Sequence, residues 1–452
     1  MNYDVCNAPV ALRDADALDA WNQMIRAFLA HGTQTPVHLG TVMERAPDFA
    51  LGHAARGIFS MLMGRRELVQ TAVEASETAR KNIDASSDLR TLQWCAALDI
   101  WLKGYPSQSV AMLETIIDSN PSDTLTAKVI HAIRFVLGDA MGMRQSIERV
   151  LPSHKSDHPL AGFILGCHAF ALEETGDYEA AEQAGLRGLQ LAGDDAWGLH
   201  AVAHVHDMTA RSEDGIALIE GNASAWDHCN NFRYHVWWHK ALLHLDLGQT
   251  AVALDLYDQK IRQDKTDDFR DISNATSLLV RLELEGLDVG DRWTELADLS
   301  ETRTDDGCLA FADLHYMLAL AGDHRADAAT HLIARLYRDG AGKSDTANVA
   351  RHPGVAAATG LSEFAEGRYD SAFKNLSAAY PELPTIGGSH AQRDVFERMT
   401  IDAGIRAGNL DGAEDFLNRR KARRAGIDDR FAATRFASIE AARRYAERIP
   451  AQ

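Results

Sequence analysis

The chain has 452 residues, of which 46% are hydrophobic and 25% are charged, a composition typical of soluble globular proteins. Its formal net charge is −19, from 46 Lys and Arg residues against 65 Asp and Glu residues. Nucleic acids and anionic membranes both bind basic surfaces, so this charge argues against either partner. No apolar run approaches the roughly 18–20 residues that span a bilayer, and no secretory signal is visible, so we expect a cytoplasmic protein.

The cysteines agree with that compartment. The chain has five, widely scattered and without a CxxC pair, which is typical of reduced thiols. Cys167 and Cys308 fall within helical patterns, and we expect both to be small core residues.

The length exceeds the roughly 250–300 residues at which a single compact core stops growing. Stacked repeats avoid that limit, because each unit buries its apolar face against its neighbours. The clearest unit is a predicted helix over 160–174, a turn at 175–178 and a second helix over 179–192. A glycine and an aromatic residue in the turn, followed by small residues, are typical of tetratricopeptide repeats.

Residues that break the helical pattern recur about every 34 to 38 positions, with one unit skipped before the last. Strand signals are nearly absent. We therefore predict an all-α fold, a tetratricopeptide-like α-solenoid forming a right-handed superhelix of helix–turn–helix repeats. The predicted breaks are Gly138, Gly176, Ser212, Gly248 and Gly322.

We interpret residues 1–452 as a single solenoid domain. The segment 339–353, rich in glycine, serine and charged residues, is predicted to be a surface loop insertion. Residues 426–452 are predicted to form a C-terminal helical cap.

A histidine precedes each break by seven to nine residues. Equivalent positions of successive first helices line one surface of a solenoid, so the recurrence predicts where imidazoles could meet. The recurring histidines are His131, His168, His204, His239 and His315.

Two HxxxH segments follow from this pattern. Each places two imidazoles on one helix face, with Cβ atoms about 5–6 Å apart. The distance from His200 to His235, and from His204 to His239, is 35 residues, or one repeat. We therefore expect the two pairs to face each other as a four-histidine group.

Three roles fit such a group. Imidazoles at this spacing can chelate a divalent metal, although the absence of HExxH excludes the zinc-protease helix. Without a metal, His204 and His239 are the candidates for general acid–base catalysis, because the histidine pKa lies near neutrality. The third role is structural, with the rings bonded to each other, to Asp207 or to backbone carbonyls. Trp197, Trp237 and Trp238 are predicted to supply apolar walls around the group.

The segment GGSHAQRD at 387–394 is the other candidate. Ser389 and Gln392 have capping-box spacing, which predicts the start of a helix. Helix-start N–H groups and Arg393 could hold an anionic group, and the alternative is an ordinary capped helix with a surface pair between Arg393 and Asp394. A basic cluster at 419–424 is predicted to be a solvated helix face.

These segments resemble the tetratricopeptide repeat protein 38 family over nearly the whole chain. The resemblance is carried by GHA at 52–54, DAWGLHAVAHVHDM at 195–208, HVWWHKALLHLDLG at 235–248, FADLHYMLALAG at 311–322 and GGSHAQRDVF at 387–396. It implies a tetratricopeptide-like fold but no particular substrate. The residues at motif positions are His53, His131, His200, His204, His206, His235, His239, His315, Arg393 and Asp394, with His390 as a looser match.

The sequence thus predicts a protein that binds a small polar or anionic ligand in a concave pocket rich in His and Trp. The motifs leave open whether it is an enzyme. The motifs leave the cofactor open, and the candidate is a divalent metal at His200, His204, His235 and His239. The alternative is a scaffold for protein partners, which holds a peptide in an accessible groove of mixed charge. An enzyme would instead need a pocket where the histidines, the tryptophans and Arg393 converge.

Overall fold

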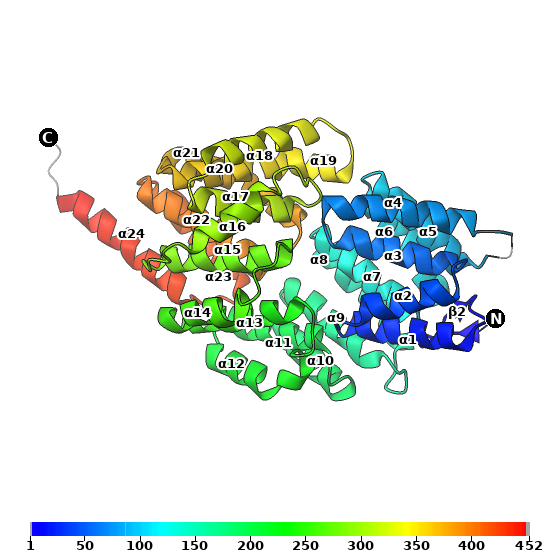
Figure 1. The fold of residues 1–452 in the computed structure, drawn as a ribbon. Helices are drawn as coiled ribbons and strands as arrows, with labels where there is room; N and C mark the ends of the chain where they lie inside the picture. Colours follow the sequence, from blue (N-terminus) through cyan, green and yellow to red (C-terminus); the bar gives the residue numbers. More distant parts are fainter. Residues whose placement is uncertain (1, 86, 449–452) are drawn as a thin grey trace. The chain divides into compact units, whose positions relative to one another are not determined.

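The computed structural model describes residues 2–85 and 87–448, which are almost entirely helical (Figure 1). Contacts between residues divide the chain into two compact units. Unit 1 comprises residues 1–202, 221–233 and 342–348, and unit 2 comprises 203–220, 234–341 and 349–452. The prediction of a single domain over 1–452 and that of a right-handed superhelix stay predictions. The C-terminal cap predicted at 426–452 contains the helix α24 (Arg430–Arg448). Its residues 449–452 lie outside the described residues.

The elements of unit 1 begin with a short hairpin and continue as helices. They are β1 (Asn2–Tyr3), β2 (Pro9–Val10), α1 (Ala15–Leu29), α2 (Thr35–Arg45), α3 (Ala50–Leu62), α4 (Arg66–Lys81), α5 (Leu89–Leu102), α6 (Pro106–Ser119), α7 (Thr124–Val136), α8 (Ala140–Val150), α9 (Ala161–Glu174) and α10 (Tyr178–Leu191).

The next helices, four of which cross a boundary between the units, lead into unit 2. They are α11 (Ala196–Met208), α12 (Ser212–Gly221), α13 (Phe232–Asp246), α14 (Thr250–Leu256), α15 (Phe269–Leu284), α16 (Arg292–Glu301), α17 (Ala310–Gly322), α18 (Ala326–Asp339), α19 (Asp345–Val349), α20 (Val355–Ala365), α21 (Tyr369–Ala379), α22 (His390–Arg406), α23 (Leu410–Arg423) and α24 (Arg430–Arg448).

Successive helices pack in pairs, as the predicted solenoid requires, and α9 with α10 is the clearest pair. Their bounds match the helices predicted at 160–174 and 179–192. Glycines permit the close approach: a Cβ on Gly188 would lie 2.9 Å from the carbonyl oxygen of Gly162, and one on Gly162 would lie 2.6 Å from the Ala192 Cβ. The fold is therefore an all-α arrangement of tetratricopeptide-like helix pairs.

The turns between paired helices confirm three of the predicted breaks and correct two. Gly176, like Gly138 and Gly248, has a positive φ, which favours glycine. At the other two breaks the left-handed residues are Ala210 and His324. The predicted Ser212 and Gly322 lie inside helices instead, as the first residue of α12 and the last of α17.

Two short segments carry more regular structure than the sequence indicated. Residues 2–3 and 9–10 form an antiparallel hairpin, which closes around the Asp4 carboxylate because it accepts from the backbone N–H groups of Cys6 and Ala8. The segment predicted as a loop at 339–353 contains α19, where Ser344 Oγ accepts from the Ala347 backbone N–H at 3.2 Å.

The five cysteines are free thiols in the structure, as the scattered spacing predicted. Cys167 is buried, and burial raises the pKa of its thiol to about 11. Cys308 is only partly buried, because it lies in the turn before α17 and not inside a helix.

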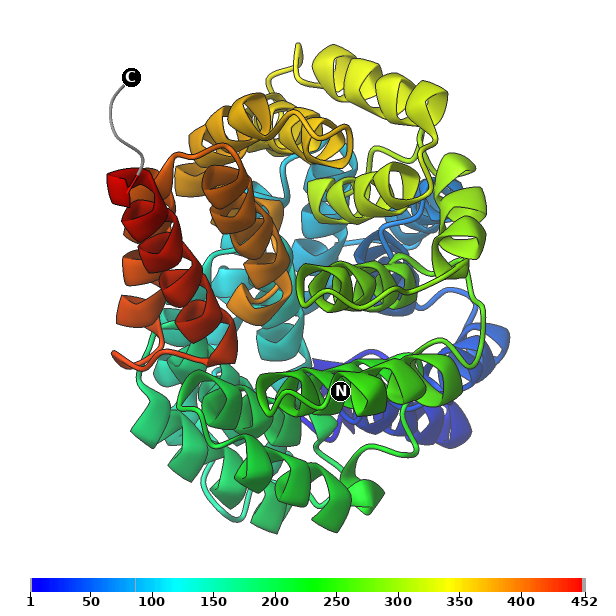
Figure 2. The ribbon, with the colours of Figure 1, turned by 90° about the vertical axis from the view of Figure 1, so that its left-hand side faces the viewer.

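Each unit has its own hydrophobic core. Trp21 and Trp94 are among the largest buried side chains of unit 1, and Trp238, Tyr316 and Phe396 are among those of unit 2. In unit 2, the orange helix α22 runs alongside the red helix α24 (Figure 2).

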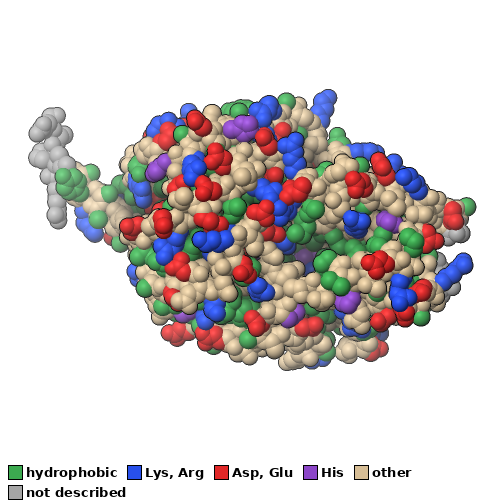
Figure 3. Space-filling model, viewed as in Figure 1, with side chains coloured by type: hydrophobic (Ala, Val, Ile, Leu, Met, Phe, Trp, Pro, Cys, Tyr) green, Lys and Arg blue, Asp and Glu red, His purple; other side chains and the backbone are tan. Residues whose placement is uncertain are grey.

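Acidic and basic side chains are interspersed over the face of the molecule shown in Figure 3. The net charge of −19 is therefore not gathered into one acidic patch on that face. Across residues 2–85 and 87–448, none of the helices combines the length and hydropathy needed to cross a bilayer.

The close packing of α9 on α10 predicts the effect of adding a single methyl group. Gly162→Ala should lower the free energy of unfolding by about 1–3 kcal/mol, because the new Cβ overlaps α10. Gly40→Ala inside α2 is the matched control, because a Cβ there meets nothing within 4 Å, and alanine should stabilise that helix by roughly 0.5–1 kcal/mol. Urea denaturation measures both changes, and an equal response of the two variants would contradict the predicted contact.

Candidate functional site

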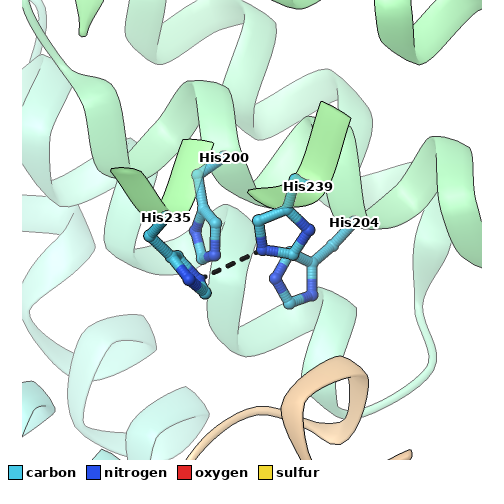
Figure 4. Close-up of side chains that lie close together, drawn as sticks. All are labelled: His200, His204, His235 and His239. Atoms are coloured by element: carbon cyan, nitrogen blue, oxygen red, sulfur yellow. Dashed lines mark hydrogen bonds between the residues drawn. The ribbon is translucent and has the colours of Figure 1, made fainter. Parts of the chain in front are cut away.

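The two HxxxH segments form the turns of α11 and α13 that carry the candidate site. Figure 4 shows His200 and His204 on α11 and His235 and His239 on α13. His204, His235 and His239 each offer a ring nitrogen, and these three nitrogens lie within 4.8 Å of one another. His204, His235 and His239 belong to unit 2, and His200 lies one turn before His204 on the same helix.

The three histidines of unit 2 are in direct ring contact. The His204 and His239 ring centroids are 4.3 Å apart, and both residues are buried. The Nε2 atoms of His235 and His239 lie 3.1 Å apart, along the dashed line in Figure 4. Two nitrogens bound to one tetrahedral zinc ion at about 2.0–2.1 Å would lie roughly 3.3 Å from each other. The observed separation is therefore close to that of two ligands of one ion.

Helix α15 orients the ring of His235 through a hydrogen bond. Asn274 Oδ1 lies 2.8 Å from His235 Nδ1. An amide oxygen only accepts, so Nδ1–H donates to it and Nε2 keeps its lone pair toward His239. Trp238 stacks on the same ring at 5.1 Å between centroids and donates through Nε1 to Ser277 Oγ at 3.1 Å. The His235 ring is thus fixed on two sides, as in metal sites where an outer partner orients the ligand.

Burial favours the neutral form of His235. It lowers the pKa of His235 to about 4, a shift that the hydrogen bond to Asn274 opposes and the charge of His204 assists. A neutral imidazole is the form that binds metals, so at neutral pH His235 needs no deprotonation before it coordinates an ion.

A cleft lies beside the cluster within unit 2. Its empty volume, which includes open solvent, is about 620 Å³. His390 at the start of α22 lines it, and the His390 ring centroid is 5.5 Å from that of His204. Its acidic lining residues are Asp207, Asp246, Glu285 and Asp394. Its basic lining residues are Arg398, Arg420, Arg423, Arg424 and Arg430.

Buried ion pairs hold the C-terminal helices against this cleft. Arg420 is 2% exposed, and its Nε donates to Asp394 Oδ1 at 2.7 Å while its Nη1 donates to Asp429 Oδ1 at 2.7 Å. Burial alone would raise the pKa of Asp394, but the charges of Arg398, Arg420 and Arg281 hold it well below its ordinary value. Both carboxylates are therefore charged at neutral pH.

Arg424 ties the end of the same segment to α11. Its Nη2 donates to the Asp207 carbonyl oxygen at 2.6 Å and to Asp207 Oδ1 at 3.0 Å. Asp207 lies three residues after His204, so this contact fixes the end of the helix that carries His204.

Arg281 of α15 contacts both Trp238, which packs on the histidine cluster, and the first turn of α22. Its guanidinium lies 5.4 Å from the Trp238 ring centroid, and its Nη2 donates to the Ala391 carbonyl oxygen at 2.7 Å. Burial lowers the pKa of Arg281 to about 9. This arginine therefore carries its charge at neutral pH, where the Trp238 ring and the nearby Asp394 carboxylate compensate it.

Several predicted site residues pack elsewhere, inside unit 1. His53 Nε2 hydrogen-bonds with the Pro47 carbonyl oxygen at 2.8 Å. His131 and Trp197 form edge-on contacts with each other and pack against Phe170. His168, one of the recurring histidines, lies 3.5 Å from a carboxylate oxygen of Glu148 on α8.

Other predicted residues of unit 2 make contacts with residues outside the cluster. His206 packs beside Gly215 of α12, and Trp237 lies against Lys240 and Lys260. His315 Nδ1 donates to the Phe311 carbonyl oxygen at 2.8 Å, the usual partner for a buried ring.

The segment at 387–394 begins α22 with the predicted capping box between Ser389 and Gln392. The Arg393 guanidinium donates to the carbonyl oxygens of Gly387 and Gly388 in its own loop. The predicted Arg393–Asp394 surface pair is not what these contacts show, since Asp394 pairs with Arg398 and Arg420 instead.

The basic cluster at 419–424 was expected to be a solvated helix face, and this is wrong for two of its members. Arg420 and Arg424 are 2% and 5% exposed, because Asp394, Asp429 and Asp207 pair with them. Their spacing of four residues, on one face of α23 and its cap, is the signal that could have separated them from their exposed neighbours. Nothing comparable marks Asn274 or Arg281 in the sequence.

No protein-family model matches the chain. Among solved structures, the crystal structure of the yeast Tom70 is similar to 95% of this chain and 88% of that chain, at 11% identity and a TM-score of 0.37. The structure of Naa15/Naa10 bound to HypK-THB is similar to 95% of this chain and 67% of that chain, at 12% identity and a TM-score of 0.25.

The lowered pKa of His235 predicts how stability depends on pH. The folded-state pKa of about 4 lies below the ordinary value of 6.5, so protonation favours the unfolded chain. The contribution of His235 is complete above pH 6.5 and is lost as the pH falls from 6.5 toward 4. Between pH 6.5 and pH 4, the free energy of unfolding of the unmodified protein should therefore fall by up to about 3 kcal/mol more than that of His235→Gln. Denaturant titrations at several pH values measure the difference, and parallel curves would contradict it.

Proposed function

We propose that this protein binds a divalent transition-metal ion through His204, His235 and His239 and accepts a small polar molecule in the adjacent cleft. The observation that carries the proposal is the convergence of these ring nitrogens, with Nε2 of His235 and His239 only 3.1 Å apart. The HxxxH spacing makes His200, one turn before His204, the candidate fourth ligand. Imidazole donors suit zinc, copper, nickel and iron, so the proposed ion belongs to this group and not to the oxygen-preferring calcium and magnesium.

Three further features support a metal over a purely structural cluster. Burial favours the neutral form of His235, as ligation requires. Asn274 orients His235 in the way that outer partners orient metal ligands. His390 lines the cleft and its ring centroid lies 5.5 Å from that of His204, so a molecule in the cleft would lie close to the ion.

The proposal extends to the chain's relationships and location. We infer that the chain is related to the tetratricopeptide repeat protein 38 family, because His204, His239 and the segment at 387–396 fall at its motif positions. We also propose that the protein acts in the cytoplasm, as its free cysteines suggest.

The metal proposal is tested by elemental analysis of the purified, untagged protein. We expect about one metal ion per chain, lost in the His204→Ala/His239→Ala double variant because two ligands are removed. Asn274→Ala should keep the ligands but lower metal affinity about 10–100-fold, as loss of an orienting partner does. Isothermal titration with Zn²⁺ measures the affinities.

The matched control is His244→Ala on the same helix, where the ring bonds to Gln249 and not to the cluster. It should bind metal like the unmodified protein. Equal metal content in the double variant, or none in any sample after Zn²⁺ titration, would refute the metal site.

A second candidate function is protein–protein interaction, which the mixed charge of the cleft favours. Carboxylates and arginines line it together, and Arg393 lies outside it, which is the arrangement expected of a peptide groove. Helix pairs of this kind commonly present such a surface to a peptide.

The two functions respond differently to charge reversal. If the cleft holds a protein partner, Arg423→Glu/Arg430→Glu should remove specific proteins from affinity-purified samples, because both side chains line the cleft and are about half-exposed. His204→Ala/His239→Ala should leave the same proteins bound. Quantitative mass spectrometry of the purified samples measures both, and no difference between the charge-reversed and unmodified protein would exclude this role.

A further inference from the structure

The charges that line the cleft are mostly paired within the protein. Arg398 and Arg420 bind Asp394 and Asp429, and Arg424 binds Asp207. These groups are therefore occupied in holding the helices together. Two charged residues on the cleft wall, Asp246 and Arg430, do not share in these pairs.

Asp246, the last residue of α13, is a carboxylate without a cationic partner. Its Oδ2 accepts from the Ser212 hydroxyl at 3.0 Å and its Oδ1 from the Arg430 backbone N–H at 3.2 Å. Among the described residues, no Lys, Arg or His side chain forms an ion pair with it. Burial, with the charges of Asp207 and Asp429, raises the pKa of Asp246, and the more distant Arg424 opposes the shift. A positively charged ligand group would relieve this cost.

Arg430, the first residue of α24, is a cation with a weak partner. Its nearest carboxylate oxygen is Glu285 Oε2 at 3.9 Å from Nε, and Glu285 is already held by Arg435 at 2.7 Å. The guanidinium makes no hydrogen bond within the described part of the chain, and its side chain is 49% exposed. Its planar fork is therefore available for a carboxylate.

The two residues adjoin on the cleft wall, because the Arg430 backbone N–H donates to the Asp246 carboxylate and both residues line the cleft. We propose that the cleft binds a small zwitterion of the amino-acid or short-peptide class, with its ammonium on Asp246 and its carboxylate on Arg430. The inference rests on the proposed function, since it names the small polar molecule that the cleft accepts. His390, which lines the same cleft, links this ligand to the histidine cluster at His204.

Three probes of similar size test the charge requirement. Glycylglycine carries both charges, N-acetylglycine only the carboxylate and glycylglycinamide only the ammonium. We expect glycylglycine to bind at least about tenfold more tightly than either analogue, because each analogue can pair with only one of Asp246 and Arg430 and leaves the other without a ligand group. Isothermal titration of protein stripped with a chelator, and of Zn²⁺-loaded protein, measures the affinities.

Two variants assign the contacts. Asp246→Asn keeps the shape of the side chain and one of its two acceptor oxygens while it removes the charge, and it should abolish the preference for glycylglycine over N-acetylglycine. Arg430→Gln should abolish the preference over glycylglycinamide. The control is Arg443→Gln on the same helix α24, whose side chain pairs with Asp411 and Glu414 and should not affect binding.

Equal binding of the three probes, an undiminished preference in Asp246→Asn and Arg430→Gln, or no binding tighter than about 10 mM would overturn the inference. Failure of the metal proposal is recognised separately. If Zn²⁺ does not bind but stripped protein still selects glycylglycine, the zwitterion site stands. If Zn²⁺ binds to the histidines and no probe is selected, only the zwitterion site is refuted.

Discussion

The cost of burying polar groups constrains the part of unit 2 around the cleft more than any other interaction. Guanidinium, carboxylate and imidazole groups lie there between helices, where water cannot compensate them. Arg420 meets this cost with two carboxylates, Arg424 with the end of α11, and Arg281 with a carbonyl oxygen and an aromatic face. The positions of α11, α22 and α23 in this region depend on these pairings, because moving one helix would leave a charge unpaired.

The sequence could predict two kinds of contact: those between equivalent positions of adjacent repeats, and those between residues of one helical turn. His204 and His239 were placed together because one repeat returns an equivalent position to the adjacent helix, so a 35-residue offset becomes a spatial contact. The capping box at Ser389 was predictable for a different reason, since both partners lie within one helical turn. Recurrence alone was insufficient, however: His131, His168 and His315 share the spacing but bond within their own surroundings.

The contacts that depend on distant segments could not be predicted from the sequence. Arg424 and Asp207 are 217 residues apart, and no periodic pattern connects them. Arg393 illustrates a second limit, because a long flexible side chain can satisfy its charge on nearby carbonyl oxygens as well as on a ligand. The turns show a third: Ala210 and His324 adopt the left-handed conformation that glycine adopts at other turns, so composition alone misplaces the break.

The amide of Asn274 has a consequence for the charge of the cluster. Where a carboxylate supports a metal-bound histidine, it supplies negative charge to the site. Asn274 is neutral, and imidazoles bind metals in their neutral form, so a dication held by them would keep its full charge in a buried setting. An anion entering the coordination sphere would therefore gain strongly from neutralising it. Such a site would be selective for oxyanions or hydroxide as the exchangeable ligand, a preference set by a residue that never touches the metal.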